Sequence, residues 1–275
     1  MTTSIFATYE TIFILGAADP EMNSIEKILN AKGLRFIHAV NKLKRCHPGN
    51  VYDATLDAPQ GTPAVLIECV TKNHGHDESL VYRIDHHNPG DPGYNCGPEE
   101  FWQGSSIGQL CELIGVSLLE AEEILGVNPL LIAAGDHCPA AAYRSECPGV
   151  DVDALMAWRA ETRAAFQKRS VSEVIEDVLT TSSIVEENVT EESYIGGILS
   201  NVTSLGEIPE LPEASLRTGV PVLYRLFDKR AEQWKEGLLG GSPEQVNTFK
   251  THWESKGYKP YGVPVRGFAG VMLDK

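Results

Sequence analysis

Several sequence features are missing from these 275 residues, and each absence argues against a class of protein. No run of about 18 or more apolar residues is present, so the sequence predicts no membrane-spanning helix. The first residues, MTTSIFATYETIFILG, have neither the basic segment nor the small-residue cleavage site of a signal peptide. The six cysteines are scattered, which favours reduced thiols over a disulfide framework. We therefore expect a cytoplasmic protein with no membrane partner.

Positive charge is also scarce. The 23 Lys and Arg residues face 38 Asp and Glu residues, giving a formal net charge of −15. The strongest basic cluster, NKLKRCH at 41–47, is short. Proteins that grip long nucleic acids neutralise phosphates with a basic face, so the composition disfavours a nucleic-acid-binding module. A small anionic ligand that binds through a bound cation is compatible with this charge.

The hydrophobic pattern predicts a mainly parallel α/β sheet with flanking helices. A short apolar run at 11–16 is followed by a helix over 20–33, with apolar residues at helical spacing and Gly33 at its end. Three further strands are predicted over 34–40, 63–70 and 79–87. This order of elements is typical of an open sheet with parallel strands.

The second half of the chain is first helical and then mixed. Helices are predicted over 105–116, 117–127, 128–137, 151–170 and 170–179, and Ser117 with Glu120 forms a capping-box signature. We expect an α/β domain with a helical connector over 1–183, a linker region over 184–219 and a small C-terminal α+β domain over 220–275. That last domain comprises a strand at 220–227, a helix at 242–257 and a glycine-bearing turn near the end.

Several acidic residues and histidines lie where a strand or a short helix is expected to end. In open α/β sheets, ligands bind beyond the carboxyl ends of the strands. Divalent cations that act on phosphate prefer carboxylate oxygen and imidazole nitrogen. The candidates for a converging cation site are Glu21, Glu68, Asp85, His86, His87 and Asp136.

The segment IDHHNPGD at 84–91 resembles the signature of the DHH phosphoesterase superfamily. This superfamily includes RecJ-type exonucleases, oligoribonucleases, cyclic dinucleotide phosphodiesterases and manganese-dependent family II pyrophosphatases. ILGAADPEMNSI at 14–25 has the layout of the family's first motif, a strand running into G-H-x-N-P-D-x-D and then a helix. VLIECV offers Glu68 for the second motif, and LIAAGDHCP offers Asp136 for the fourth. The resemblance covers most of the chain and is strongest at 84–91.

The resemblance implies a hydrolase that acts on a phosphodiester or phosphoanhydride, with Mn²⁺ or Mg²⁺ as its cofactor. Its substrate would be a small nucleotide, a short oligonucleotide or a cyclic nucleotide, with pyrophosphate ranked behind them. The implied cation ligands are Glu21, Asn23, Glu68, His86 and Asp136. His87 would face the substrate phosphate, with Asp85 orienting the two histidines. Arg144 and Arg266, the latter beside Gly267, are the candidate substrate clamps. A homodimer is left open.

The sequence departs from the family pattern at the first motif. Ala17 stands where the motif has its histidine, and Glu21 and Asn23 stand where it has aspartates. A shifted register, with Asp19 and Glu21 as the acidic pair, would restore two carboxylates, and His47 could supply the lost imidazole. The C-terminal domain has GLLGG and RGFAG in place of the family's Gly-Gly-His. With these departures, we expect an enzyme with one cation site rather than two. The alternative is a catalytically lapsed protein that binds a nucleotide or a protein partner in an inter-domain cleft.

The same residues also allow interpretations in which their roles are purely structural. Asp85, His86 and His87 could form a surface turn, and Asp136 could cap a helix end. Asp19 could be the N-cap of the first helix, with Pro20 in its first turn. A zinc site at His137, Cys138 and Cys147 fits no common zinc-motif spacing.

Overall fold

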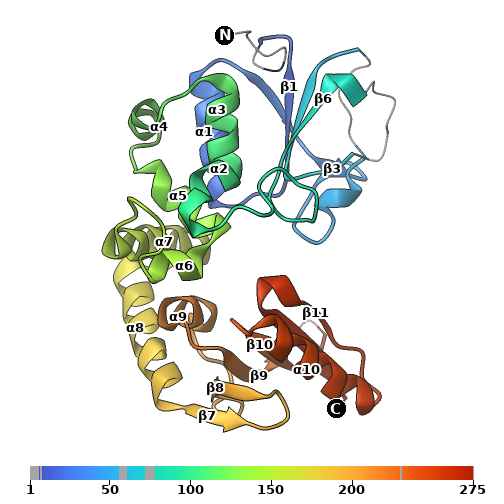
Figure 1. Ribbon diagram of the computed structural model, residues 1–275, viewed down its shortest axis with the longest axis vertical. Helices are drawn as coiled ribbons and strands as arrows, with labels where there is room; N and C mark the ends of the chain where they lie inside the picture. The colour runs from blue at the N-terminus through green and yellow to red at the C-terminus, as the bar shows by residue number, and fades with distance from the viewer. Residues whose placement is uncertain (1–5, 7, 56–60, 72–77, 230, 275) are drawn as a thin grey trace. The chain divides into compact units, whose positions relative to one another are not determined.

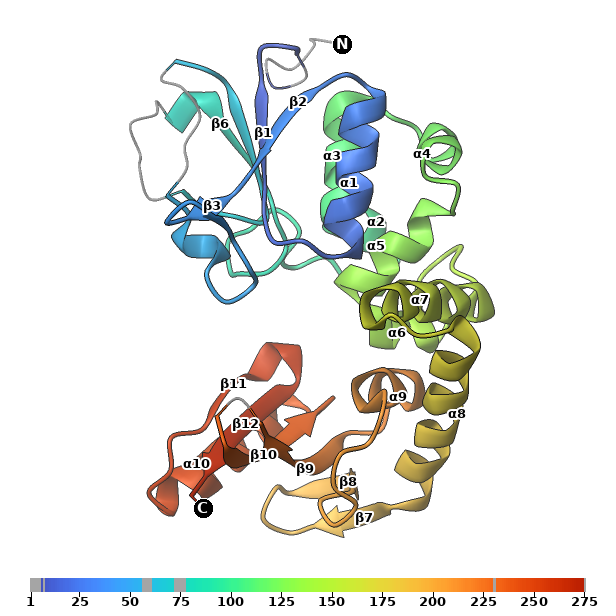
Figure 2. The ribbon, with the colours of Figure 1, turned by 180° about the vertical axis from the view of Figure 1, so that it is seen from behind.

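The computed structural model describes residue 6 and residues 8–55, 61–71, 78–229 and 231–274. The chain divides into two compact units, Met1–Trp158 and Arg159–Lys275, and the division falls within helix α7 (Val152–Gln167). Figures 1 and 2 show the two units from opposite sides. In the part of the chain that the structure describes, no helix has the length and apolar character needed to cross a membrane.

The N-terminal unit is built on a four-stranded parallel sheet in the order β2-β1-β5-β6, which confirms the predicted sheet. Its strands are β1 (Ile12–Leu15), β2 (Arg35–His38), β5 (Ala64–Ile67) and β6 (Val81–Ile84). A separate hairpin joins β3 (Val40–Asn41) to β4 (Lys44–Arg45). The helices of this unit are α1 (Pro20–Ala31), α2 (Phe101–Gly104), α3 (Ser106–Ile114), α4 (Leu118–Leu125), α5 (Pro129–His137) and α6 (Pro139–Tyr143), with 3-10 turns at Val51–Asp53, Glu78–Leu80 and Pro98–Glu100.

Both faces of this sheet are covered, which explains why β1 and β5 are apolar at every position. Ile12, Ile14 and Leu66 on one face pack against the segment that contains Val51 and Ala54. Helices α1 and α3 lie together against the opposite face (Figures 1 and 2). Strands buried on both faces have continuous apolar sequences rather than alternating ones. In β1 and β5, polar side chains are therefore confined to the residues that follow the strand ends.

The helix boundaries follow the predicted capping residues. Asp19 caps α1 by accepting a hydrogen bond from the backbone N–H of Met22 at 2.7 Å, and Pro20 lies in the first turn. Ser117 caps α4, but the carboxylate of Glu120 pairs with Lys32 Nζ at 2.9 Å instead of returning to the cap. The predicted cap is therefore present, whereas the second half of the capping box is replaced by an ion pair.

The C-terminal unit contains a six-stranded sheet in the order β11-β12-β10-β9-β8-β7, in which only the β8–β9 pair is parallel among the described residues. Helix α10 packs on one face through Phe249 and Trp253. Helices α8 and α9 pack on the other face through Val185, Leu211 and Ala214. The elements are α8 (Val171–Glu187), β7 (Val189–Glu192), β8 (Gly197–Asn201), α9 (Leu211–Thr218), β9 (Val222–Asp228), β10 (Gln233–Leu239), α10 (Pro243–Ser255), β11 (Tyr261–Val263), a 3-10 turn at Pro264–Arg266 and β12 (Phe268–Leu273).

The domain limits in the structure differ from the predicted 1–183, 184–219 and 220–275. Residues 184–219, expected as a linker, include the last turn of α8 together with β7, β8 and α9. β7 and β8 continue the same sheet as β9. β7 reads Val-Thr-Glu-Glu and is largely exposed at the sheet edge, so it lacks the apolar alternation by which a strand is recognised.

A buried ion pair fastens α7 to α9 within the C-terminal unit. Arg159 makes two hydrogen bonds, of 2.6 and 2.7 Å, to the carboxylate of Glu213, which is 1% exposed. We expect Glu213→Ala to lower the free energy of unfolding by about 3 kcal/mol, because it leaves a largely buried guanidinium without its partner. The exposed Glu254 provides the control, since Glu254→Ala should change stability by less than about 0.5 kcal/mol. Chemical denaturation measures both, and equal stabilities would contradict this account.

Candidate metal centre

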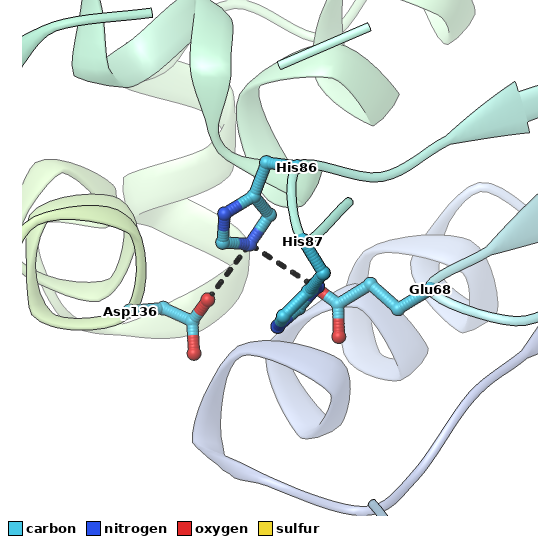
Figure 3. A group of neighbouring side chains, drawn as sticks. All are labelled: Glu68, His86, His87 and Asp136. Carbon is cyan, nitrogen blue, oxygen red and sulfur yellow. Dashed lines mark ion pairs between the residues drawn. The ribbon is translucent and has the colours of Figure 1, made fainter. Parts of the chain in front are cut away.

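Two neighbouring strands and one helix end at the same place in the N-terminal unit. Ile67 and Ile84 pair as the last residues of β5 and β6, so Glu68 and the run Asp85–His87 emerge side by side. Asp136 comes from the last turn of α5. Glu68, His86, His87 and Asp136 each offer a ligand atom, and these atoms all lie within 4.8 Å of one another. Figure 3 shows the four side chains directed toward a common point.

The backbone at Glu68 takes an unusual conformation that directs its carboxylate into this group. Glu68 has φ of 49°, in the left-handed region that non-glycine residues rarely adopt. Its N–H donates to the carbonyl of Ile84 at 2.9 Å. Gly16, at the end of β1, allows the close approach of this peptide, because a Cβ at position 16 would lie 2.5 Å from the carbonyl oxygen of Glu68. Gly16 is therefore part of what places Glu68.

Asp85 organises the two histidines that follow it. Its side chain is fully buried and Oδ1 accepts hydrogen bonds from the backbone N–H groups of His86 and His87, at 2.8 and 3.0 Å. The same oxygen lies 2.9 Å from His87 Nδ1, and the Tyr52 hydroxyl donates to Oδ2 at 3.2 Å. Burial raises the pKa of Asp85, but the bonds from His87 and His86 outweigh it and hold the pKa below its usual value. The pKa of His87 is raised in turn, because its bond to Asp85 outweighs the effect of burial.

His86 lies between two carboxylates and a third histidine. Its Nε2 is 3.0 Å from Asp136 Oδ2 and 3.4 Å from Glu68 Oε1. Burial lowers the pKa of His86, but Asp136 and Glu68 together raise it to about 10. On the other side of the ring, Nδ1 faces His137 Nδ1 at 3.0 Å. Without a cation, these two carboxylates therefore favour the protonated form of the His86 imidazole.

Two more carboxylates add to the negative charge. Glu21 is fully buried and accepts a hydrogen bond from the N–H of Ile107 at 3.0 Å. Burial and the charges of Asp136 and Glu68 raise the pKa of Glu21 well above its usual value. Burial and the same two charges raise the pKa of Asp19 to about 7. Four acidic side chains thus gather around one imidazole.

This donor set fits a divalent cation. Glu21 Oε2, Glu68 Oε1 and His86 Nε2 are buried, and their polar contacts are made within this acidic group, as in the ion pairs of His86 with Asp136 and Glu68. Hard divalent cations bind such atoms at about 2.0–2.6 Å, so ligands on opposite sides of an ion lie about 4–5 Å apart, which matches the 4.8 Å limit of the group. Mixed carboxylate and imidazole donors suit Mn²⁺, and the carboxylates also suit Mg²⁺.

Asn23 and Arg144 are both exposed, and their roles as cation ligand and substrate clamp stay predictions. Asn23 is exposed on α1, because residues two apart on a helix cannot face the same side and Glu21 faces inward. Arg144 is exposed, and its guanidinium makes two hydrogen bonds of 2.8 Å to Glu146. Arg266 and Gly267 belong to the C-terminal unit, so their role as substrate clamps stays a prediction.

Two compensations were considered for the altered first motif: His47 for the imidazole, and the shifted register with Asp19 and Glu21 for the two carboxylates. His47 is exposed in a turn, where its Nδ1 accepts from the N–H of Gly49 at 3.1 Å, so it does not replace an imidazole at the site. Ala17 is buried in the apolar core. Asp19 acts both as the cap of α1 and as a close neighbour of Glu68 and Asp136. The shifted register, with Asp19 and Glu21 as the acidic pair, therefore describes the geometry better than Glu21 with Asn23.

The zinc alternative is not supported. Cys138 Sγ and Cys147 Sγ are 3.2 Å apart, but the His137 ring contacts His86 Nδ1 and the carbonyl of Cys96. The site contacts of His137, and those of Tyr52 with Asp85, carry no signal in the sequence. In the first, the end of helix α5 meets the loop at Cys96, and in the second, the 3-10 turn Val51–Asp53 meets the end of β6.

The close approach at Gly16 leads to the first test of this site. We expect Gly16→Ala to displace the Glu68 peptide and weaken Mn²⁺ binding by about ten-fold or more. Gly97→Ala is the matched control, since a Cβ there meets no atom within 4 Å. Calorimetric titration of Mn²⁺ into folded variants measures the effect, and unchanged affinity in Gly16→Ala would contradict it.

The shifted pKa values predict how the cation-free protein responds to pH. The usual pKa of Asp19 is 3.8 and its folded value is about 7, so its contribution to stability is lost as pH rises through this window. His86, with a usual pKa of 6.5 and a folded value of about 10, loses its contribution between these values. In chelator, the free energy of unfolding should therefore fall from about pH 5 to about pH 9, and Asp19→Asn should flatten the lower part. A rise in stability over this range would be inconsistent with both shifts.

Comparison with known proteins gives little further information. No protein-family model and no curated protein matches the sequence. Among solved structures, the chain is similar to one described as a pGpG-specific phosphodiesterase, PggH from Vibrio cholerae. The two chains are 13% identical with a TM-score of 0.48, over 96% of this chain and 92% of the other. Proteins this weakly similar need not share a mechanism, so function is inferred from the residues of this chain alone.

Proposed function

We propose that this protein is a cation-dependent phosphoesterase of the DHH type. It hydrolyses a phosphodiester or phosphoanhydride in a small nucleotide, a short oligonucleotide or a cyclic nucleotide. One observation carries the proposal: Glu68, His86, His87 and Asp136 offer ligand atoms within 4.8 Å of one another, where two parallel strands and helix α5 end. Acidic residues and histidines so placed are typical of cation sites that act on phosphate.

The cation is Mn²⁺ or Mg²⁺, and Glu68, His86 and Asp136 hold it. When bound, it lowers the pKa of water and stabilises charge on phosphate oxygens. Glu21, fully buried beside these ligands, adds a carboxylate to the same site. Binding requires the carboxylates to be ionised and His86 to be neutral at Nε2, so protons are released on binding.

His87 is the residue we assign to the substrate. Asp85 holds Nδ1 of the ring at 2.9 Å, which directs Nε2 away from that carboxylate. The raised pKa of His87, caused by its bond to Asp85 against the effect of burial, keeps the ring protonated more readily near neutral pH. A protonated Nε2 donates a hydrogen bond to a phosphate oxygen, and that bond strengthens as negative charge develops in the transition state.

The first motif supports one cation site rather than two. Ala17 is buried among apolar residues and offers no ligand atom, and Asn23 is exposed. Asp19 and Glu21 remain as the acidic pair beside Glu68 and Asp136. With a formal net charge of −15, the protein favours a small substrate bound through the cation over a long polyanion.

The same observation at Ala17 motivates a second candidate function. A protein that has lost one ligand of a two-cation site can keep its affinity for a nucleotide or a protein partner while losing turnover. Such a receptor would still bind a cation at Glu68, His86 and Asp136. It differs from the enzyme only in the rate of hydrolysis.

A panel of substrates separates the two functions. We expect Mn²⁺-dependent hydrolysis of linear dinucleotides, cyclic nucleotides or pyrophosphate, lost by about 100-fold or more in His86→Ala and Asp136→Ala, which remove proposed cation ligands. His47→Ala, at an exposed histidine, should retain full activity. Nucleotide binding without turnover in the unaltered protein would favour the receptor, and absence of cation binding would exclude both functions.

A further inference from the structure

His137 lies outside the group that offers cation ligands, yet it is bonded at both ring nitrogens. Its Nδ1 is 3.0 Å from Nδ1 of His86, and its Nε2 is 3.0 Å from the carbonyl oxygen of Cys96. The rings of His86 and His137 lie 4.8 Å apart between centroids at an angle of 49°. A continuous path of hydrogen bonds therefore runs from a backbone carbonyl to the proposed cation ligand.

The Cys96 carbonyl determines which atom donates and which accepts in both hydrogen bonds of this path. A carbonyl oxygen only accepts, so Nε2 of His137 carries the hydrogen. In a neutral imidazole the other nitrogen, Nδ1, then holds a lone pair and accepts. Of two ring nitrogens facing one another at 3.0 Å, one must donate, so Nδ1 of His86 carries the hydrogen. When His86 loses its second proton, as cation binding requires, the lone pair is therefore left on Nε2, which faces Asp136 and Glu68.

We propose that His137 is a positioning residue that transmits the hydrogen-bond direction set by the Cys96 carbonyl to His86 and so fixes the His86 lone pair on Nε2, toward the cation site. The inference rests on the proposed cation site for its functional meaning. The hydrogen-bond path itself is a property of the cation-free protein. His137 donates to the carbonyl and accepts from His86 whether or not Nε2 of His86 is occupied.

A neutral histidine such as His137 is a suitable hydrogen-bond partner for His86, because the site is already strongly acidic. Cation-binding histidines usually donate their second ring N–H to a carboxylate, a carbonyl or water. A carboxylate at this position would add a fifth acidic group to Asp19, Glu21, Glu68 and Asp136. A neutral imidazole orients His86 without adding charge.

The surrounding loop makes room for this arrangement. Gly104 ends α2, and a Cβ at position 104 would lie 2.7 Å from both Cε1 and Nε2 of His137 and 2.6 Å from Cβ of Cys96. Gly93, in the loop that follows His87, donates its N–H to the carbonyl of Asp85 at 3.0 Å. The glycine-rich loop thus returns to the site and presents the Cys96 carbonyl to His137.

Nuclear magnetic resonance of the cation-free wild-type protein, with ¹⁵N-labelled histidine, reads the proposed hydrogen positions directly. We expect His137 to show a protonated Nε2 and an unprotonated Nδ1, with a hydrogen on Nδ1 of His86. A protonated Nδ1 on His137 would overturn the inference. This measurement needs neither turnover nor any variant.

Cation affinity then tests the consequence. His137→Phe keeps an aromatic ring but removes the acceptor, and we expect Mn²⁺ to bind about 10- to 100-fold more weakly. His137→Gln, whose amide can accept from His86 and donate to Cys96, should restore affinity to within a few-fold of wild type. Gly104→Ala, which displaces the ring without removing it, should match His137→Phe, whereas the exposed control His47→Phe should bind as wild type does.

The outcomes distinguish this inference from the proposed function. Wild-type affinity in both His137→Phe and Gly104→Ala would overturn the role of His137 and leave the cation site intact. Equal losses in His137→Phe and His137→Gln would also overturn it, because a general packing defect would then explain both. Absence of Mn²⁺ binding in the wild-type protein would overturn the proposed function, and the hydrogen positions read by resonance would still decide the path from Cys96 to His86.

Discussion

The site depends on the mutual repulsion of crowded carboxylates, of which Glu21 and Glu68 are buried and Asp19 and Asp136 half-buried. Asp19, Glu21, Glu68 and Asp136 come from a helix start, a strand end and a second helix end, and without a cation they are offset by protons and by His86. Burying like charges together is unfavourable unless a positive charge accompanies them. The fold therefore holds these groups near one another at a cost in stability, which a divalent cation bound among them would relieve.

The residues around the site have two tasks. They hold the acidic groups close together, and they keep the histidine rings in fixed orientations. Gly16 and the left-handed backbone of Glu68 perform the first task. Asp85 performs the second for His87, and His137 with the Cys96 carbonyl performs it for His86. The Pro- and Gly-rich loop after His87 thus supplies the Cys96 carbonyl that orients His86 through His137.

Residues adjacent to a strand end could be located from the sequence, and residues that depend on the return of a distant loop could not. Glu68 and His86 follow apolar runs whose parallel pairing is readable, so their convergence was predicted. His137 was considered only for zinc, because nothing in the sequence shows that Cys96 approaches it. Asn23 is exposed while Glu21 is buried, because helix phase, and not similarity of motif, decides which side of α1 each residue occupies. The edge strand Val189–Glu192 was missed because its exposed, charged residues show no alternation.

The conformation of Glu68 has a consequence for anyone who alters this protein. A left-handed residue with a Cβ is disfavoured by about 1 kcal/mol relative to glycine, which adopts this backbone freely. Selection for heat resistance alone would therefore favour glycine or asparagine at this position, at the expense of the carboxylate. Thermostabilised variants are best screened for cation binding as well as stability. This second criterion rejects variants that gain thermal stability by losing the Glu68 carboxylate.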